Sequence, residues 1–546
     1  MQPFNPTTDS FGAGGPTRLV LVGPPGTGKT RASLDHFILP ALRACAPDKV
    51  LACSFSNAAA DELRTRLGTA LGVPSERLRE TCSTIHSEAL RRYKRFGDPN
   101  PKLYDPLSGT SKPLKREFGP DVVDAPTSKL REAACAAWDY IRAILKHKEP
   151  RYAGWCCDRR FTQGGRHNAL EIEACIERFE QEKAEQGAID FSDMLLRALN
   201  YEGRELDLLL CDEVQDNTPL QNALIDHWSK WARVVVLCGD PDQTVHGWAG
   251  ADYQGLLSRV RSPDWQTRVL DQSYRVPRSA HSAARYIVGR IEDREDAEYL
   301  PRAHDGEVLR RTEAEVIDAL HALCTEYVNA PDPELEPNAP PPRSAFVLCR
   351  TNMMVSGMRK ALNKAAVPYP FAPATAMRVR AVIDLCRDGK AQTLHAQKMI
   401  EKLPAAFFVG KKKDALEAAS RLQDAYATPE MLHLKPSDIG TMIDALQGIS
   451  GDKGYWQAVV ARYPSWILTE PPPIEVRTMH DSKGAEADFV FLNATKPASV
   501  RVVDDAELRV LYVACTRTRD KLWVFGDGYT ELTEAVEQAT AADVPF

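Results

Sequence analysis

Residues 17–30 read TRLVLVGPPGTGKT, and this stretch decides the fold of the chain. The apolar run 17–22 predicts a buried strand, and TRASLDHFILPAL (30–42) predicts a helix. The octapeptide between them fits the G-x-x-x-x-G-K-[ST] phosphate loop, in which glycines let backbone N–H groups approach phosphate oxygens. Lys29 supplies positive charge to the terminal phosphates, and the Thr30 hydroxyl is a ligand for Mg²⁺. The loop residues predicted to bind nucleotide are Gly23, Pro24, Pro25, Gly26, Thr27, Gly28, Lys29 and Thr30.

Two more apolar runs end in polar side chains suited to ATP hydrolysis. LDLLL (206–210) leads into Asp212 and Glu213, and RVVVLC (233–238) leads into GDPDQ, which contains Gln243. A carboxylate at a strand end can hold Mg²⁺, which is the role predicted for Asp212. Glu213 beside it can orient and deprotonate the attacking water, and Gln243 can sense a γ-phosphate by hydrogen bonding. Taken alone, the Asp212–Glu213 pair also fits a solvated turn after a core strand; the upstream phosphate loop favours the ATP site.

Bulk composition narrows the class of protein. The 546 residues predict roughly three or four domains. The chain contains no apolar run of about 18 residues, and its first residues do not resemble a secretory signal, so we expect no membrane span. Its 13 cysteines are scattered through apolar segments without C-x-x-C spacing, which predicts reduced thiols, a cytoplasmic protein and no structural zinc. The net charge of −6 argues against a basic coat protein for nucleic acid, but not against a local DNA-binding cleft.

The order of predicted elements indicates two α/β halves. Alternating strands and helices recur before and after the middle of the chain, and TRVLDQSYRVPRSA (267–280) predicts a strand that ends in Tyr274 and Arg275. Two stretches, about 90–188 and 386–468, are instead charged and helical. The predicted fold is therefore two parallel α/β sheets, each interrupted by a mostly helical insertion.

Ten motifs in a fixed order carry a resemblance to a known family. They are GPPGTGKT, SFSNAAADELRTRL, TIHS, IDFSDMLLRAL, DEVQD, GDPDQTVHGWAGA, LDQSYR, RTN, TMHDSKGAEAD and LYVACTRTRD, and they span residues 23–520. The series resembles the superfamily 1 DNA helicases of the UvrD/Rep/PcrA family. The resemblance implies two RecA-like P-loop domains: 1A at 1–88 and 189–268, insertion 1B at 89–188, 2A at 269–385 and 470–546, and insertion 2B at 386–469.

The resemblance also assigns roles at the nucleotide. In this family ATP, with Mg²⁺, lies between the two RecA-like domains. Lys29, Asp212, Glu213 and Gln243 are then catalytic residues of the first domain, with Thr30 and Asp212 as the Mg²⁺ ligands. Arg275 and Arg517 resemble the paired arginines of the second domain, because a guanidinium fork spreads the charge of a transferring phosphoryl group. Tyr274 resembles the residue that stacks on adenine, and Glu486 resembles a ribose-side contact.

Flat rings beside polar groups mark the residues expected to bind single-stranded DNA. Stacking of bases on aromatic rings is indifferent to sequence, as a moving motor requires. The ring-bearing residues that match the family's DNA contacts are Phe55, His86, His246 and Trp248. The positions that match backbone or sugar contacts are Asn57, Arg350, Asn352, Thr478 and His480.

The sequence departs from the family in four places. No LNxxQ element precedes the phosphate loop, so adenine selectivity stays open. His246 replaces the usual tyrosine, Ala249 replaces the usual arginine, and the second insertion is short.

The function expected is that of an ATP-dependent 3′→5′ single-stranded DNA translocase and helicase. It would act as a monomer or weak dimer on single strands and on junctions with duplex, in the cytoplasm of a bacterial or phage-infected cell. Two alternatives stay open: a translocase that does not unwind, and an ATP-gated DNA-binding subunit that unwinds only with a partner such as a nuclease. Repair, replication restart, phage replication and anti-phage defence also stay open as pathways.

Overall fold

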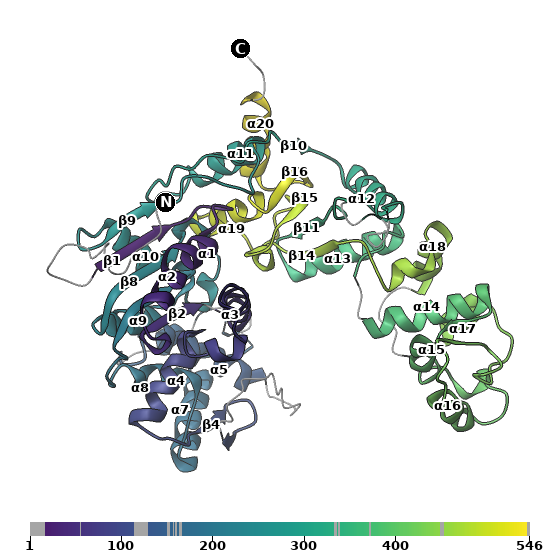
Figure 1. Ribbon diagram of the computed structural model, residues 1–546, viewed down its shortest axis with the longest axis horizontal. Coiled ribbons are helices and arrows are strands. Elements are labelled where there is room, and N and C mark those ends of the chain that lie inside the picture. The colour runs from purple at the N-terminus through teal and green to yellow at the C-terminus, as the bar shows by residue number, and fades with distance from the viewer. Residues whose placement is uncertain are drawn as a thin grey trace. The chain divides into compact units, whose positions relative to one another are not determined.

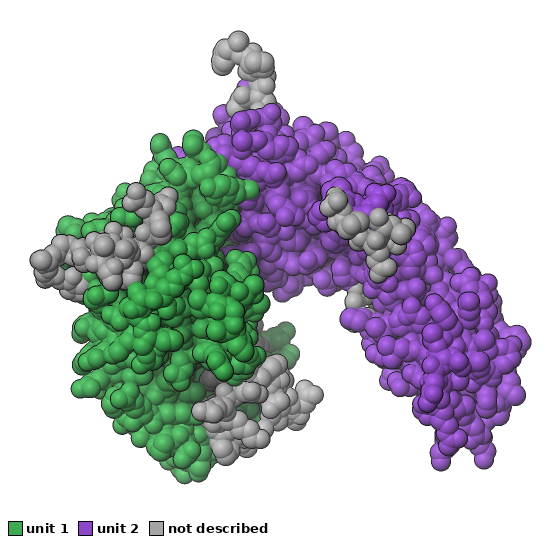
Figure 2. Space-filling view, viewed as in Figure 1, with its two compact units in different colours: residues 1–274, 291–300, 504–510 green, residues 275–290, 301–503, 511–546 purple. Residues whose placement is uncertain are grey.

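The chain folds as two units, each built around its own parallel sheet. The computed structural model describes residues 17–54, 56–113, 129–149, 153–156, 158, 161–162, 166–331, 336, 339–370, 373–447 and 453–542. The first unit comprises residues 1–274, 291–300 and 504–510, and the second comprises 275–290, 301–503 and 511–546 (Figure 2). The predicted α/β fold with two parallel sheets is confirmed.

The first sheet has six parallel strands in the order β3-β2-β7-β8-β1-β9. Their bounds are β1 Thr17–Val22, β2 Val50–Ser54, β3 Cys82–Thr84, β7 Leu206–Cys211, β8 Ala232–Gly239 and β9 Gln266–Val269. Side chains alternate between the two faces of a strand, so Leu19 and Leu21 enter one core, and Val20 and Val22 enter another. The helices of the first core include α2 (Leu39–Ala44) and α3 (Asn57–Leu71); those of the second include α4 (Ile85–Phe96), α8 (Phe191–Ala198) and α9 (Pro219–Ser229) (Figure 1).

The helix that follows the phosphate loop is not uniform. It begins as α1 (Lys29–Ser33), widens into the π-helical turn η1 (Leu34–Ile38) and continues as α2. Within the π turn the Leu39 N–H bonds to the carbonyl of Leu34, five residues back. Pro40 has no N–H to donate, and its ring crowds the carbonyl four residues back, which explains the wider turn at this point.

The first insertion is mostly helical, as predicted, but it also contains a small sheet. Its helices are α5 (Lys129–Ala143), α6 (Ala153–Cys156) and α7 (Ala169–Gln186). The strands β4 (Lys102–Asp105), β5 (Thr110–Pro113) and β6 (Ala188–Ile189) form a sheet in the order β5-β4-β6, which the sequence did not predict.

A buried ion-pair network joins this insertion to the core. Arg142 of α5 lies 2.7 Å from Asp190 and 3.1 Å from Asp193, at the start of α8. Lys183 of α7 lies 2.9 Å and 2.7 Å from the same two carboxylates. Burial opposes ionisation of Asp190, yet the two cations outweigh burial and lower its pKa. Both cations are almost fully buried, so the network fixes where α5 and α7 meet α8.

The second sheet has five parallel strands in the order β10-β16-β15-β11-β14. The strand bounds are β10 Glu307–Arg310, β11 Ala345–Cys349, β14 Ile474–Thr478, β15 Ala487–Asn493 and β16 Thr518–Phe525. Helices of this half are α11 (Arg278–Val288), α12 (Glu313–Val328), α13 (Asn352–Lys364), α14 (Pro373–Asp388), α19 (Asp505–Cys515) and α20 (Thr530–Ala542).

The second insertion is continuous with the core of the second sheet. Its elements are α15 (Thr393–Ile400), α16 (Lys412–Ser420), α17 (Ile439–Ala445), α18 (Lys453–Arg462) and the short strands β12 (Ala391–Gln392) and β13 (Tyr426–Ala427). Trp456 and Phe408 of the insertion belong to the same apolar cluster as Val347 of β11. The strands of the second sheet lie in the ranges predicted for 2A. Those of the first lie in the ranges predicted for 1A except β9, which ends one residue beyond 268, and the domain boundaries themselves stay a prediction.

One predicted strand end is wrong. The strand expected to run to Tyr274 and Arg275 ends at Val269, and the following residues leave the sheet. Their backbone groups bond elsewhere: the Ser273 N–H donates to the carbonyl of Leu300, and the Tyr274 N–H donates to the carbonyl of Gly26. These local partners replace the ladder that a longer strand would need. No helix among the described residues is long and apolar enough to cross a membrane.

We predict that Arg142→Ala lowers the free energy of unfolding by about 3–5 kcal/mol, because Asp190 and Asp193 then share the single cation of Lys183. Urea unfolding followed by circular dichroism measures this change. The control is Arg421→Ala, which removes an exposed arginine paired with Glu417 and should cost about 1 kcal/mol or less. Equal losses in the two variants would contradict a special role for the buried network.

Candidate active site

The phosphate loop is folded around its own lysine. Gly26 and Gly28 have φ of 73° and 79°, a left-handed conformation that side-chain-bearing residues rarely adopt. The Gly23 N–H donates to the carbonyl of Gly239 at 3.0 Å, which ties the loop to the end of β8. The Lys29 ammonium donates to the carbonyl of Gly23 at 2.7 Å. A Cβ atom at Gly23 would lie 1.9 Å from Cγ of Lys29, so this glycine leaves room for the lysine side chain.

The two acidic residues predicted for catalysis lie beside this loop. The Thr30 hydroxyl donates to Asp212 at 3.3 Å, and the Lys29 ammonium lies 4.0 Å from the Glu213 carboxylate. Burial, and then the charge of Glu213, raise the pKa of Asp212 to about 6, while Lys29 opposes the shift. A hydroxyl and a carboxylate are hard oxygen donors, and their convergence fits Mg²⁺. When bound, the ion would neutralise charge on the phosphate oxygens.

Gln215 and Asp240 connect the acidic pair to Gln243, and sequence reasoning missed both of them. The Gln215 amide donates to the Glu213 carboxylate, and its carbonyl accepts from the Asp240 N–H at 3.1 Å. The Gln243 amide donates to the Asp240 carboxylate at 2.7 Å. Gln215 is fully buried. The signal that the sequence offered was its position in the DEVQD motif, directly after two catalytic candidates.

The remaining sequence-predicted nucleotide residues divide between the two units, and each is described within its own unit. Tyr274 ends the stretch bonded to the phosphate loop, and its side chain is 73% exposed. In the second unit the Arg275 guanidinium donates to Glu486, so the structure pairs two predicted site residues. Arg519 also lies 3.5 Å from Glu486. Arg517 is buried, and its guanidinium donates to the carbonyl of Val513 at 2.8 Å.

The candidate DNA residues of the first unit follow the carboxyl ends of its strands. Asn57, after β2, is exposed, and His86, after β3, packs edge-on against Phe191 with ring centroids 6.5 Å apart. Burial lowers the pKa of His86 to about 4, so this ring is neutral at pH 7. Trp248, after β8, is 63% exposed and stands edge-on to His246 at 6.3 Å. Phe55 lies outside the described residues.

The candidate DNA residues of the second unit follow two paired strands. Arg350 and Asn352 follow β11, Thr478 is the last residue of β14, and His480 follows it. The two strands pair residue for residue from Ala345 to Cys349. The Thr478 hydroxyl donates to Asp481 at 2.7 Å and is buried, whereas Asn352 is exposed. The four side chains therefore gather at one edge of the second sheet. Their roles, like those of the other site residues, stay a prediction.

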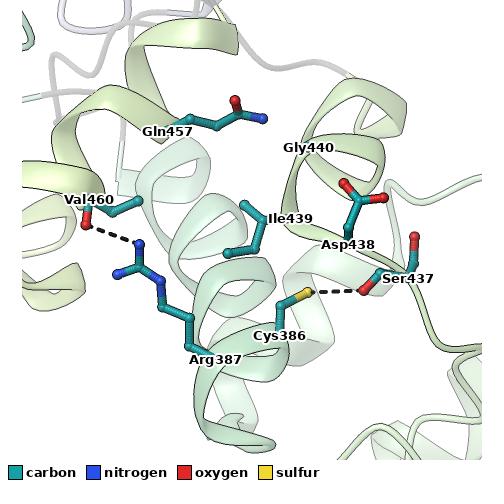
Figure 3. Close-up of a pocket in the computed structure, with 8 residues that line it drawn as sticks. All are labelled: Cys386, Arg387, Ser437, Asp438, Ile439, Gly440, Gln457 and Val460. Carbon is teal, nitrogen blue, oxygen red and sulfur yellow. Dashed lines mark hydrogen bonds between the residues drawn. The ribbon is translucent and has the colours of Figure 1, made fainter.

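A hollow of about 570 Å³ in the second insertion holds none of the predicted site residues (Figure 3). One wall carries Arg387, whose guanidinium donates to the carbonyl of Val460 at 3.1 Å. The lining residues are Cys386, Arg387, Ser437, Asp438, Ile439, Gly440, Gln457 and Val460. Its polar groups bond within the insertion, and we assign it no part in the chemistry.

Comparison with known families agrees with this geometry. Residues 12–263 match the family model of the UvrD/REP helicase N-terminal domain, and residues 473–525 match that of the UvrD-like helicase C-terminal domain. The chain belongs to the UvrD-like helicases. The matched segments contain the phosphate loop, the acidic pair, Gln243, Thr478, Glu486 and Arg517.

Two curated UvrD-like relatives are similar along much of the chain. The ATP-dependent DNA helicase PcrA of Staphylococcus aureus (strain Mu50) is 24% identical over 369 residues, which cover 64% of this chain and 48% of that protein. PcrA of Staphylococcus epidermidis (strain RP62A) is 22% identical over 606 residues, covering 93% of this chain and 81% of the relative. The chain thus spans about half the length of the S. aureus relative it matches.

Gly23→Ala is predicted to weaken ATP binding at least about tenfold while the protein stays folded, because the added methyl group displaces the Lys29 side chain from the loop. Titration with a fluorescent ATP analogue measures the affinity. Gly357→Ala is the matched control, since its Cβ would meet open space in α13. An unchanged affinity in Gly23→Ala would show that the Lys29 position is not needed for binding.

For Trp248→Ala we expect single-stranded DNA affinity to fall by about 1–3 kcal/mol, the usual contribution of one base stacked on an aromatic ring. Fluorescence anisotropy with a labelled oligonucleotide provides the measurement. Tyr426→Ala removes a half-exposed ring from the second insertion and serves as the control. A loss of the same size in both variants would argue against stacking at Trp248.

Proposed function

We propose that this UvrD-like chain is an ATP-dependent 3′→5′ single-stranded DNA translocase and helicase. It binds ATP with Mg²⁺ at the phosphate loop, where Lys29 holds phosphate charge and Thr30 and Asp212 hold the ion. Glu213 activates the attacking water, and Gln243 senses the γ-phosphate. Arg275 and Arg517 spread the negative charge of the transferring phosphoryl group, the role that the family resemblance implies for them.

One observation supports this proposal above the others. Both the nucleotide candidates and the DNA candidates of the first unit follow the carboxyl ends of strands in a single parallel sheet. Asp212 directly follows β7, whose neighbours in the sheet are β2 and β8, and His86 and Trp248 follow β3 and β8. A movement of these strand ends on ATP hydrolysis would therefore move the DNA residues directly, because both sets of residues follow strands of the same sheet.

The preferred substrate is single-stranded DNA next to a duplex. Exposed Trp248 offers a face to any base, and the polar residues Asn57, Arg350 and Asn352 fit sugar and phosphate groups. The polarity is carried over from the family, as are roles in repair or replication. A nuclease or another partner that completes unwinding stays an alternative.

The deciding experiment is strand displacement on duplexes with a 3′ tail, a 5′ tail or no tail, with ATP and Mg²⁺. We expect opening of the 3′-tailed duplex only, and a loss of about 10²–10³ in kcat of the ATPase for Lys29→Ala, because a preorganised charge on the phosphates is removed. Equal opening of the 5′-tailed duplex would overturn the polarity. ATPase stimulated by single strands without any opening would favour the partner-dependent alternative.

A further inference from the structure

Two short segments of the chain belong to the first unit although the residues on both sides of each belong to the second. We call residues 291–300 strap A and residues 504–510 strap B. Strap A connects α11 to the segment before β10, and strap B contains the first residues of α19. Each strap is thus covalently continuous with the second unit at both of its ends.

Strap A is bound to the loop that carries Gln243. The Arg294 guanidinium donates twice to one carboxylate oxygen of Asp242, from Nε at 3.0 Å and from Nη2 at 2.8 Å. Both side chains are nearly buried, with 12% and 7% exposed. The Asp242 N–H in turn donates to Asp240, the residue that holds the Gln243 amide. Two residues, Asp242 and Asp240, therefore connect Arg294 of strap A to the candidate γ-phosphate sensor Gln243.

The other end of strap A is bound near the phosphate loop. Leu300 accepts from the Ser273 N–H at 2.8 Å, and its own N–H donates to the carbonyl of Asp271 at 2.7 Å. The Ser273 hydroxyl then donates to the carbonyl of Pro25 at 2.8 Å. One ten-residue segment is thus anchored beside both elements expected to contact the terminal phosphates.

Strap B is anchored on strap A and on the same region of the first unit. Its Asp505 accepts from the N–H groups of Glu292 and Asp293 at 3.1 and 3.3 Å. The Arg509 guanidinium lies 4.0 Å from the ring of Tyr253 and donates to the carbonyl of Asp293 at 3.0 Å. Arg509 is 2% exposed, so its guanidinium is shielded from water, whereas the Asp505 contacts lie closer to the surface.

We propose that strap A couples the nucleotide site to the second unit, and that Arg294 is the positioning residue of this coupling through its ion pair with Asp242. The inference rests on the proposed function, since it assigns a path by which the state of Gln243 changes the second unit. The second carboxylate oxygen of Asp242 is buried and has no hydrogen-bond partner within the described residues. Burial and the neighbouring Asp240 raise the pKa of Asp242 to about 6, while Arg294 opposes this. Because Asp242 is held ionised chiefly by Arg294, a displacement of Arg294 changes the charge and the position of this carboxylate.

The test compares ATP consumed with base pairs opened. In Arg294→Gln we expect the kcat of the DNA-stimulated ATPase to fall about tenfold, with KM for ATP changed about twofold or less. ATP consumed per base pair should rise, a ratio that does not depend on the fraction of folded protein. Arg294→Lys, which keeps the charge, should recover most of the coupling.

Two further variants distinguish a loss of coupling from a loss of folding and from a general effect of removing an arginine. Asp242→Asn with Arg294→Gln leaves no unpaired buried charge, and it should fold normally yet show the same raised ATP consumption per base pair. Arg233→Gln removes an arginine of β8 that lies 3.5 Å from Asp207 and is 55% exposed, and it should behave like the parent. A parental ratio in both Arg294→Gln and the double variant would overturn the proposal.

Amide hydrogen exchange gives a readout that does not require activity. In the parent, a non-hydrolysable ATP analogue should change exchange at residues 23–30 and also at 301–311 of the second unit. In Arg294→Gln the change at 23–30 should persist and that at 301–311 should disappear. Persistence of both changes would overturn the coupling role, whereas a parent that neither hydrolyses ATP nor responds to the analogue would instead refute the proposed function.

Discussion

The pairing register of β1, β7 and β8 is the constraint on which the rest of the site depends. Val22 stands opposite Gly239, and Cys211 stands opposite Leu237, so the three strands end almost level. The hydrogen bond from Gly23 to Gly239 continues this register into the phosphate loop. A slip of one residue would turn Val20 and Val22 out of their core, so burial on both faces of the sheet fixes the register. The register in turn fixes the distances among Lys29, Asp212 and Glu213.

Charge in this protein is used to fix positions rather than to add stability. Buried ion pairs recover little net free energy, because desolvation offsets most of their attraction. Yet Arg142 and Lys183 share two carboxylates where the first insertion meets the core, and Arg294 meets Asp242 behind the Gln243 loop. An apolar contact at either place could slide, whereas an arginine fork aimed at a carboxylate defines one geometry. The first network holds the first insertion on the core, and the second holds strap A beside the Gln243 loop.

Sequence patterns predicted the parts of the site that depend on local chain order. The strand 17–22, the loop that follows it and the acidic strand end at Asp212 each combine a continuous apolar run with a motif. Gln215 could not be predicted from the sequence because its partners lie at two different strand ends. Arg294 could not be predicted because its partner, Asp242, lies 52 residues away. The strand expected to reach Tyr274 failed for a related reason. Past Val269 only Leu270 continues the apolar run, and the N–H groups of residues 273 and 274 bond to Leu300 and Gly26. Long-range partners of single residues leave no periodic trace in the sequence.

The two straps give the interrupted path of the chain between the units a physical role under the proposed function. The chain passes between the two units five times, after residues 274, 290, 300, 503 and 510. A covalent connection transmits a displacement only if it is anchored on the side where the displacement begins. Strap A is anchored beside Gln243 and beside the carbonyls of the phosphate loop, and strap B is anchored on strap A through Asp505 and Arg509. A single unanchored linker would not transmit a displacement from the nucleotide site to the second unit. Two anchored straps do transmit it, because each strap continues at both ends into segments of the second unit.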